Sequence, residues 1–175
     1  MNKIKCALVG CGRISSKHIQ ALKDNSDDFE LIAVCDVIEE RAKAVAQKEG
    51  VPFYVDLEVM LNSVPEIDLV CICTPSGLHP QHSIMASKYD KHVVTEKPMG
   101  CNVAESEQMI QVAKENNKIL FVVKQNRLNP TVLALKQAID QGRFGKIYMV
   151  QSNVFWMRPQ EYYSQAPWRG TWKMD

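Results

Sequence analysis

A glycine-rich turn follows the first apolar run of the chain and has the composition of a pyrophosphate-binding loop. Residues 4–9 read Ile-Lys-Cys-Ala-Leu-Val, and a Gly-Cys-Gly-Arg-Ile segment comes directly after them. Gly10 permits a tight bend, and Gly12 lets a phosphate approach the backbone closely. Ser15 stands where a dinucleotide fingerprint has its third small residue. The next helix would point its first N–H groups at the phosphates. The predicted contacts of a dinucleotide are Gly10, Gly12, Arg13 and Ile14.

An acidic residue, Asp36, ends the second apolar run and lies 24 residues after Gly12. At a strand end its carboxylate can accept hydrogen bonds from the ribose hydroxyls of adenosine. It would also repel a 2′-phosphate, so NAD is favoured over NADP as the cofactor. The alternative is an ordinary turn residue, but the combination with the glycine turn favours cofactor binding.

Three further polar segments follow apolar runs where strands are predicted to end. They are Thr74-Pro75-Ser76-Gly77-Leu78-His79, Glu96-Lys97-Pro98 and Lys124-Gln125-Asn126-Arg127. Ligands of open parallel sheets bind beyond the carboxyl ends of the strands, so these segments are predicted to border one site. In the first, Ser76 and His79 can bond a ribose or a phosphate beside a backbone that Pro75 fixes. His79 has an alternative role, since it can cap the helix that Pro80 is predicted to begin.

Lys97 is the predicted catalytic residue. Its ammonium can donate to a substrate hydroxyl, and partial burial would lower its pKa towards catalytic use. Glu96 can bond the nicotinamide ribose or pair with Lys97; a solvated surface pair is the simpler alternative. The amide and guanidinium groups of residues 125–127 suit a carboxamide or a polyhydroxylated substrate, the alternative being a polar domain junction.

Composition limits the function classes. Hydrophobic residues make up 46% and charged residues 23% of the 175 residues, as in ordinary globular proteins. The net charge of +1 argues against nucleic acid or an anionic membrane as a partner. No apolar stretch has the roughly 20 residues that span a bilayer, and a strand at the N-terminus argues against a secretion signal. The 6 cysteines have no Cys-x-x-Cys spacing and no matching histidines, so we expect no metal site and a reduced, cytoplasmic protein.

Apolar runs alternate with helical patterns along the first two thirds of the chain. Strands are predicted at residues 4–9, 31–36, 53–55, 67–73, 92–95 and 119–124, and helices at 16–25, 38–50, 56–62, 80–89 and 102–116. This alternation predicts an α/β fold, a Rossmann-type doubly wound parallel sheet. A helix at 129–141 and a long strand at 146–157 then change the pattern. We predict an NAD-binding domain at 1–126, and at 127–175 the truncated start of an α+β domain for substrate binding and oligomerisation.

Together these motifs resemble those of the Gfo/Idh/MocA oxidoreductase family. The glycine turn, Asp36, residues 74–79, Glu96-Lys97-Pro98 and the Asn126-Arg127 segment occur in the family's order. Ser76 stands where the family more often has asparagine. The resemblance implies an NAD-dependent dehydrogenase whose cofactor contacts include Thr74, Pro75, Ser76, His79, Glu96, Lys97 and Gln125. Alternatives within this resemblance are a dehydrogenase of another sugar or of inositol, and a non-catalytic NAD-binding module.

Residues 125–130, 142–147 and 158–172 are similar to the UDP-N-acetyl-2-amino-2-deoxyglucuronate 3-dehydrogenases within that family. This similarity implies oxidation of the sugar-nucleotide C3 hydroxyl in bacterial surface-polysaccharide (lipopolysaccharide) biosynthesis, by a homo-oligomer joined through its second-domain sheets. It places Trp168 and Arg169 near the cofactor and Lys97, Asn126, Arg127 and Arg158 near the substrate. The family's catalytic histidine follows a Gly-Gly segment that these 175 residues do not contain, so we expect the fragment to be inactive.

Overall fold

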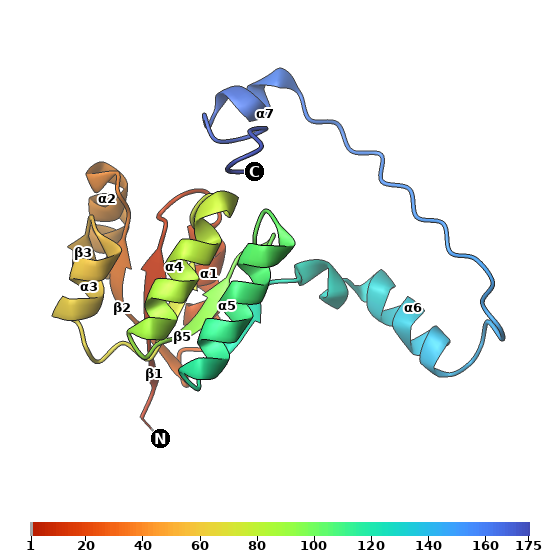
Figure 1. The fold of residues 1–175 in the computed structure, drawn as a ribbon, viewed down its shortest axis with the longest axis horizontal. Coiled ribbons are helices and arrows are strands. Elements are labelled where there is room, and N and C mark those ends of the chain that lie inside the picture. The colour runs from red at the N-terminus through yellow and green to blue at the C-terminus, as the bar shows by residue number, and fades with distance from the viewer. Residues whose placement is uncertain (1) are drawn as a thin grey trace. The chain divides into compact units, whose positions relative to one another are not determined.

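The computed structural model describes residues 2–175, which form two units. The larger unit contains the residues up to Val123 together with Gly170–Asp175, and the smaller one is Lys124–Arg169. The larger unit is an open parallel sheet with helices on both faces (Figure 1). It has the predicted α/β, Rossmann-type architecture.

The sheet has six strands in the order β3-β2-β1-β4-β5-β6, and every neighbouring pair is parallel. The strands are β1 (Ile4–Val9), β2 (Phe29–Cys35), β3 (Phe53–Tyr54), β4 (Leu69–Ile72), β5 (His92–Thr95) and β6 (Leu120–Val122). The chain proceeds outwards from β1 to β3 and then returns to β4 on the other side of β1. The carboxyl ends of β1 and β4 therefore border the crevice in which such sheets bind their ligands.

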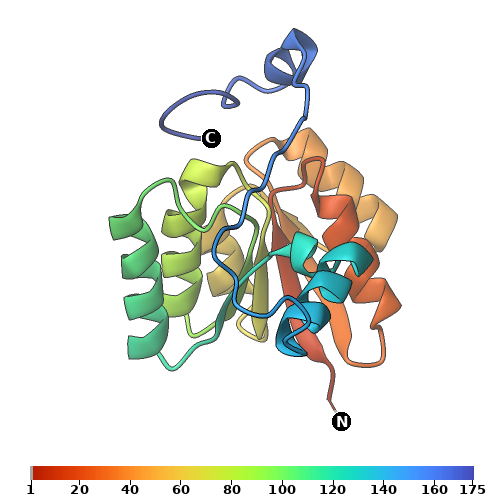
Figure 2. The same ribbon diagram turned by 90° about the vertical axis from the view of Figure 1, so that its right-hand side faces the viewer.

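Five helices connect these strands and cover both faces of the sheet (Figure 2). They are α1 (Ser15–Asp24), α2 (Glu39–Glu49), α3 (Leu57–Ser63), α4 (His79–Lys88) and α5 (Val103–Glu115). A 3-10 turn, Ser76–Leu78, precedes α4. Helices α1 and α2 pack on one face, and α3 and α4 on the other, with α5 beside α4.

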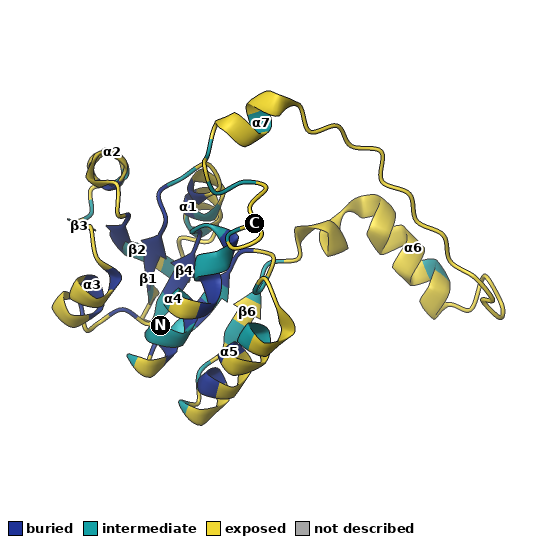
Figure 3. Ribbon diagram, turned by 45° about the horizontal axis from the view of Figure 1, so that its top comes forward, coloured by how far each residue is buried: buried dark blue, intermediate teal, exposed yellow. Residues whose placement is uncertain are grey.

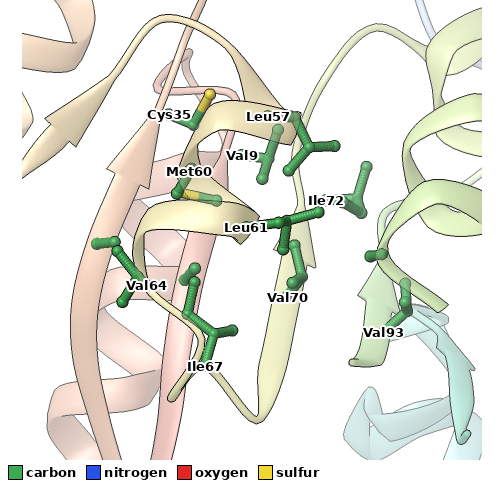
Figure 4. Packing of buried hydrophobic residues seen from close by; sticks show 13 residues of the cluster. Val9, Cys35, Leu57, Met60, Leu61, Val64, Ile67, Val70, Ile72 and Val93 are labelled. Atoms are coloured by element: carbon green, nitrogen blue, oxygen red, sulfur yellow. The ribbon is translucent and has the colours of Figure 1, made fainter. Parts of the chain in front are cut away.

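The core consists of two apolar clusters, one on each face. Figure 4 shows the first, in which Val9, Ile72 and Val93 of the strands pack against α3 residues such as Met60. The second joins Leu8 and Val34 to Ile19 of α1 and Ala46 of α2. Val9 and Leu8 contact opposite clusters because neighbouring side chains of a strand point to opposite faces. Burial on both faces explains why β1 and β4 are apolar without alternation (Figure 3).

Local side-chain and glycine signals set the ends of several helices. The Asp56 side chain accepts a hydrogen bond from the Val59 N–H at 2.9 Å and caps α3. Asn102 caps α5 in the same way, through the Glu105 N–H at 2.9 Å. One Glu105 carboxylate oxygen, Oε2, is buried without a hydrogen-bond partner among the described residues. Gly50, with φ of +72°, ends α2.

The smaller unit contains a 3-10 turn, Gln125–Leu128, and helices α6 (Pro130–Asp140) and α7 (Gln160–Ser164). The strand predicted at 146–157 is wrong: this segment has no strand, and the stretch between α6 and α7 is exposed (Figure 3). Phe155 and Trp156 are among its exposed side chains. A strand needs a neighbour that accepts and donates its backbone hydrogen bonds, and no segment of residues 2–175 pairs with this one. Within the described residues, no helix combines the length and the hydropathy needed to cross a membrane.

Candidate functional site

The glycine turn after β1 has the geometry that its sequence predicts. Gly10 has φ of +94°, and its N–H donates to the Cys35 carbonyl at 2.8 Å. A Cβ on Gly10 would lie 2.7 Å from the Cys73 carbonyl carbon and oxygen, so only glycine fits between β1 and the end of β4. A Cβ on Gly12 would meet no atom within 4 Å. Gly12 therefore faces open space, as the approach of a pyrophosphate to this backbone requires.

Asp36 is joined directly to the glycine turn. One carboxylate oxygen accepts the Cys11 N–H at 2.8 Å, and the other accepts the Ile38 N–H at 2.8 Å. The side chain is buried, yet each oxygen keeps acceptor capacity beyond its one backbone partner. The carboxylate thus holds the turn in shape and stands where a ribose hydroxyl of a bound dinucleotide would come.

The neighbours of the glycines support the turn rather than react. The Ser15 hydroxyl is buried and donates to the Gly12 carbonyl at 2.6 Å, which fixes the start of α1. Burial, with the nearby charge of Asp36, raises the pKa of the Cys11 thiol to about 12. Cys11 therefore stays a thiol at neutral pH and packs as a small apolar residue.

The segment after β4 is tied to the loop after β5 by His79. Both ring nitrogens of this buried residue face backbone carbonyls, Nε2 that of Thr74 at 2.8 Å and Nδ1 that of Pro98 at 2.7 Å. These contacts leave no ring nitrogen for a cofactor, so they support a structural role for His79 rather than the predicted cofactor contact. The Thr74 hydroxyl bonds His82 Nδ1 at 3.1 Å. Burial, together with nearby His79, lowers the pKa of His82.

Glu96 follows β5 and has a partner that the sequence reasoning missed, His18 of α1. His18 Nε2 lies 3.0 Å from one carboxylate oxygen of Glu96, and the Lys97 N–H donates to the other at 3.2 Å. Burial raises the pKa of Glu96, but the bonds from His18 and from the Lys97 backbone outweigh it, so the pKa is lowered overall. Glu96 is therefore held as a carboxylate at neutral pH. The available signal in the sequence was an ionisable residue, His18, one turn into the helix that follows the glycine turn and next to the buried Ile19.

The His18–Glu96 pair joins α1 to the end of β5, and its loss is expected to destabilise the larger unit. His18→Ala leaves a largely buried carboxylate without its side-chain donor, which should lower the free energy of unfolding by about 2 kcal/mol. His18→Gln keeps an amide donor and should recover part of that loss. Urea denaturation followed by circular dichroism measures both. Lys43→Ala, which breaks the exposed Lys43–Glu39 pair, is the control and should keep the parental midpoint. An unchanged midpoint for His18→Ala would show that the pair contributes nothing.

Lys97 differs from the prediction in one respect. Its side chain is exposed, so the burial that the sequence reasoning assumed is absent among the described residues. Its backbone N–H nevertheless donates to the Glu96 carboxylate at 3.2 Å, and the peptide bond to Pro98 is cis. Lys97 thus stands at the carboxyl edge of the sheet next to Glu96, and its charge contributes to the lowered pKa of that carboxylate.

The remaining predicted residues lie in the smaller unit. Gln125, Asn126 and Arg127 are exposed on the 3-10 turn that follows β6. Arg158 and Arg169 both stack on the Tyr162 ring, with guanidinium-to-centroid distances of 4.9 and 4.3 Å. Arg169 also donates to the Tyr162 carbonyl at 2.8 Å and lies beside Trp168. These contacts build a compact aromatic–arginine cluster around α7.

The larger unit thus brings together the glycine turn, Asp36, the Thr74–Ser76 backbone and Glu96-Lys97 at one edge of the sheet. These groups fit a dinucleotide: open backbone at Gly12 for phosphates, and carboxylates on either side of the crevice for ribose hydroxyls. Within residues 2–175, no three histidine, cysteine, aspartate or glutamate side chains are grouped so that they could hold a metal ion.

Comparison with known proteins gives consistent matches. Residues 4–124 match the oxidoreductase family with an NAD-binding Rossmann fold, Gfo/Idh/MocA. The structure is similar to the WlbA dehydrogenase of Chromobacterium violaceum in complex with NADH and UDP-GlcNAcA, with a TM-score of 0.96 and 49% identity over 99% of this chain and 50% of that chain. The corresponding Bordetella pertussis complex gives 0.95 and 47%, covering 99% and 53%.

Among curated proteins, myo-inositol 2-dehydrogenase of Thermotoga maritima is 32% identical over 149 residues, which are 85% of this chain and 44% of that protein. The chain therefore spans about half the length of the relatives that it matches.

Proposed function

Because this chain belongs to the Gfo/Idh/MocA oxidoreductase family, which binds NAD on a Rossmann fold, we propose that it is the cofactor-binding part of an NAD-dependent sugar-nucleotide dehydrogenase. The observation that carries the proposal is the joined geometry of Gly10, Gly12 and Asp36, with Glu96-Lys97 across the crevice. The proposed substrate is a UDP-N-acetyl hexuronate, oxidised at its C3 hydroxyl. Similarity over 99% of the chain to two dehydrogenases solved with NADH and UDP-GlcNAcA supports this substrate.

Each residue of the site would have its own role in binding the cofactor or orienting the substrate. NAD, when bound, accepts a hydride from the sugar carbon. The backbone at Gly12 and the N-terminus of α1 would hold the pyrophosphate, and Asp36 the ribose of adenosine. Glu96, charged and held by His18, would bond the second ribose. Lys97 would donate a hydrogen bond to the reacting hydroxyl and orient it towards the cofactor.

A base must also accept the hydroxyl proton, and none of the four histidines is placed to do so. His18 bonds Glu96, His79 bonds two carbonyls, His82 bonds Thr74, and His92 Nδ1 accepts the Ile119 N–H at 3.0 Å. We therefore propose that the 175 residues bind NAD without turning over substrate. In the proposed longer enzyme, residues outside these 175 would supply the base, and the sheet of the second domain would join the subunits of a homo-oligomer.

A second candidate is an inositol or sugar dehydrogenase, which the similarity to myo-inositol 2-dehydrogenase favours. Assays of the longer protein with UDP-N-acetylglucuronate, myo-inositol and free hexoses distinguish the two. For the first candidate, the sugar-nucleotide dehydrogenase, we propose a cytoplasmic location and a role in surface-polysaccharide synthesis. The six free thiols, five of them buried, fit a reducing compartment.

Asp36 provides the direct test of the cofactor site. Asp36→Ala should weaken NAD binding by about 10- to 100-fold, because it removes a charged acceptor of ribose hydrogen bonds. It should also reduce the preference for NAD over NADP. Isothermal titration of the 175-residue chain with each dinucleotide measures both effects.

Asp68→Ala is the matched control for this test. Asp68 also accepts a backbone N–H, that of Lys5 at 2.8 Å, but it lies at the amino ends of the strands, away from the site. The control should bind NAD like the parent. Parental NAD affinity in Asp36→Ala would contradict the proposed function.

A further inference from the structure

Residues 170–175 return to the larger unit and dock on the 3-10 turn after β4. The Gly77 N–H donates to the Met174 carbonyl at 3.1 Å. A Cβ on Gly77 would lie 2.2 Å from the Lys173 carbonyl oxygen and 2.9 Å from the Met174 Cα. Because both atoms belong to the main chain, any side chain at position 77 would displace the segment. Only glycine at position 77 leaves room for the backbone of residues 173–174, which passes directly over it.

The docked segment has a defined shape of its own. The Thr171 carbonyl accepts the N–H groups of Met174 at 3.2 Å and of Asp175 at 3.1 Å. The Asp175 carboxylate accepts the Gly170 N–H at 2.6 Å, which closes the segment into a turn. Asp175 is also close enough to Cys101 to contribute, after burial and Glu105, to the raised pKa of that thiol. The segment thus lies over the turn after β4 and close to the loop after β5.

The sheet order indicates which half of a dinucleotide this segment would border. Asp36 follows β2, so the adenosine half belongs on the β2 side of the crevice between β1 and β4. The nicotinamide half then lies over the loops after β4 and β5, which carry Ser76, Gly77 and Glu96. The segment 170–175 docks on this second half.

We propose that residues 170–175 form an outer wall of the nicotinamide half of the cofactor site, and that Gly77 is the positioning residue that holds them there. This inference rests on the proposed function, since it assumes a dinucleotide in the crevice. A wall at this place adds contacts to the reacting half of the cofactor and keeps water from it. The adenosine and pyrophosphate contacts do not depend on it.

The test compares NADH with ADP, which has the adenosine and the pyrophosphate but no nicotinamide. Isothermal titration measures both ligands on the 175-residue chain. Gly77→Ala should weaken NADH binding by about tenfold, as expected when one well-placed set of contacts is lost, and leave ADP binding unchanged. Asp175→Ala opens the turn of the segment without adding an atom near β4, and it should have the same selective effect. A general loss of stability would weaken both ligands alike.

Gly50→Ala is the matched control. Gly50 also has a positive φ of +72°, but it ends α2 at the opposite edge of the sheet, so both affinities should stay parental. Parental NADH affinity in Gly77→Ala and Asp175→Ala overturns the inference and leaves the proposed function standing. If Gly77→Ala weakens ADP binding as well, the Asp175→Ala variant becomes the deciding test. Parental NADH affinity in Asp175→Ala then also overturns the inference. A parent chain that binds neither ligand overturns the proposed function itself.

Discussion

Gly10→Ala is expected to abolish dinucleotide binding and to cost the larger unit about 3–5 kcal/mol of folding free energy, the sum of overpacking and of a strained backbone. The new methyl would lie 2.7 Å from the Cys73 carbonyl and 2.8 Å from the Thr74 N, at a φ of +94°. These atoms cannot retreat freely, because the Cys73 N–H donates to the Val9 carbonyl at 2.7 Å and joins β4 to β1. Such a loss is a large part of the stability of an ordinary domain.

Gly12→Ala, in the same turn, is expected to weaken cofactor binding without changing the stability of the fold. Its methyl would enter open space, so this variant should unfold at the parental urea concentration. It should nevertheless bind NADH weakly, since the methyl occupies the approach of the pyrophosphate. Urea denaturation and NADH titration of the two variants give the comparison. Gly10→Ala with parental stability would mean that β1 and β4 can separate at low cost.

Lys97→Met should have the largest effect on catalysis in the longer protein that the proposed function implies. Loss of the donor to the reacting hydroxyl is expected to lower kcat by about 10²- to 10⁴-fold. NADH affinity should change little, because the variant keeps the backbone and Glu96. The exposed side chain packs against no core residue, so the urea midpoint of the 175-residue chain should not move.

Steady-state kinetics with UDP-N-acetylglucuronate, beside NADH titration, measures this split. Lys43 of α2 is also exposed, so Lys43→Met is the control and should keep the parental kcat. A parental kcat in Lys97→Met would remove Lys97 from the catalytic machinery and favour a non-catalytic NAD-binding role for the family motif.

The sheet was predictable because its signals are local. The apolar runs of β1 and β4 are long enough to identify buried strands. Asp56 and Asn102 begin helices and Gly50 ends one, each through contacts within a few residues. The prediction of a strand at 146–157 was wrong, because an apolar composition shows that a segment can pair with a neighbouring strand but not that such a neighbour is present. The observed strand ends also differ from the predicted ones: β4 is Leu69–Ile72, whereas the prediction was 67–73.

The site was predictable only in part, for a related reason. Gly10, Gly12 and Asp36 form a motif with fixed spacing, so their association could be inferred from the sequence. The contact of His18 with Glu96 joins residues 78 positions apart. Gly77 and Met174 are still farther apart along the chain. Neither contact leaves a periodic or spaced pattern, and the two roles open to His79 could be weighed only once its ring partners were known.

The distribution of thiols has a practical consequence for studies in solution. Five cysteines are buried: Cys6, Cys35 and Cys71 in strands, Cys11 in the glycine turn and Cys73 directly after β4. Burial raises the pKa of each well above its usual value. Cys101 alone is exposed, in the loop after β5. A maleimide dye would therefore attach at one place in the native chain, next to the segment that ends at Asp175. The wild-type sequence thus carries its own attachment point for a fluorescent reporter of cofactor binding, without engineered cysteines.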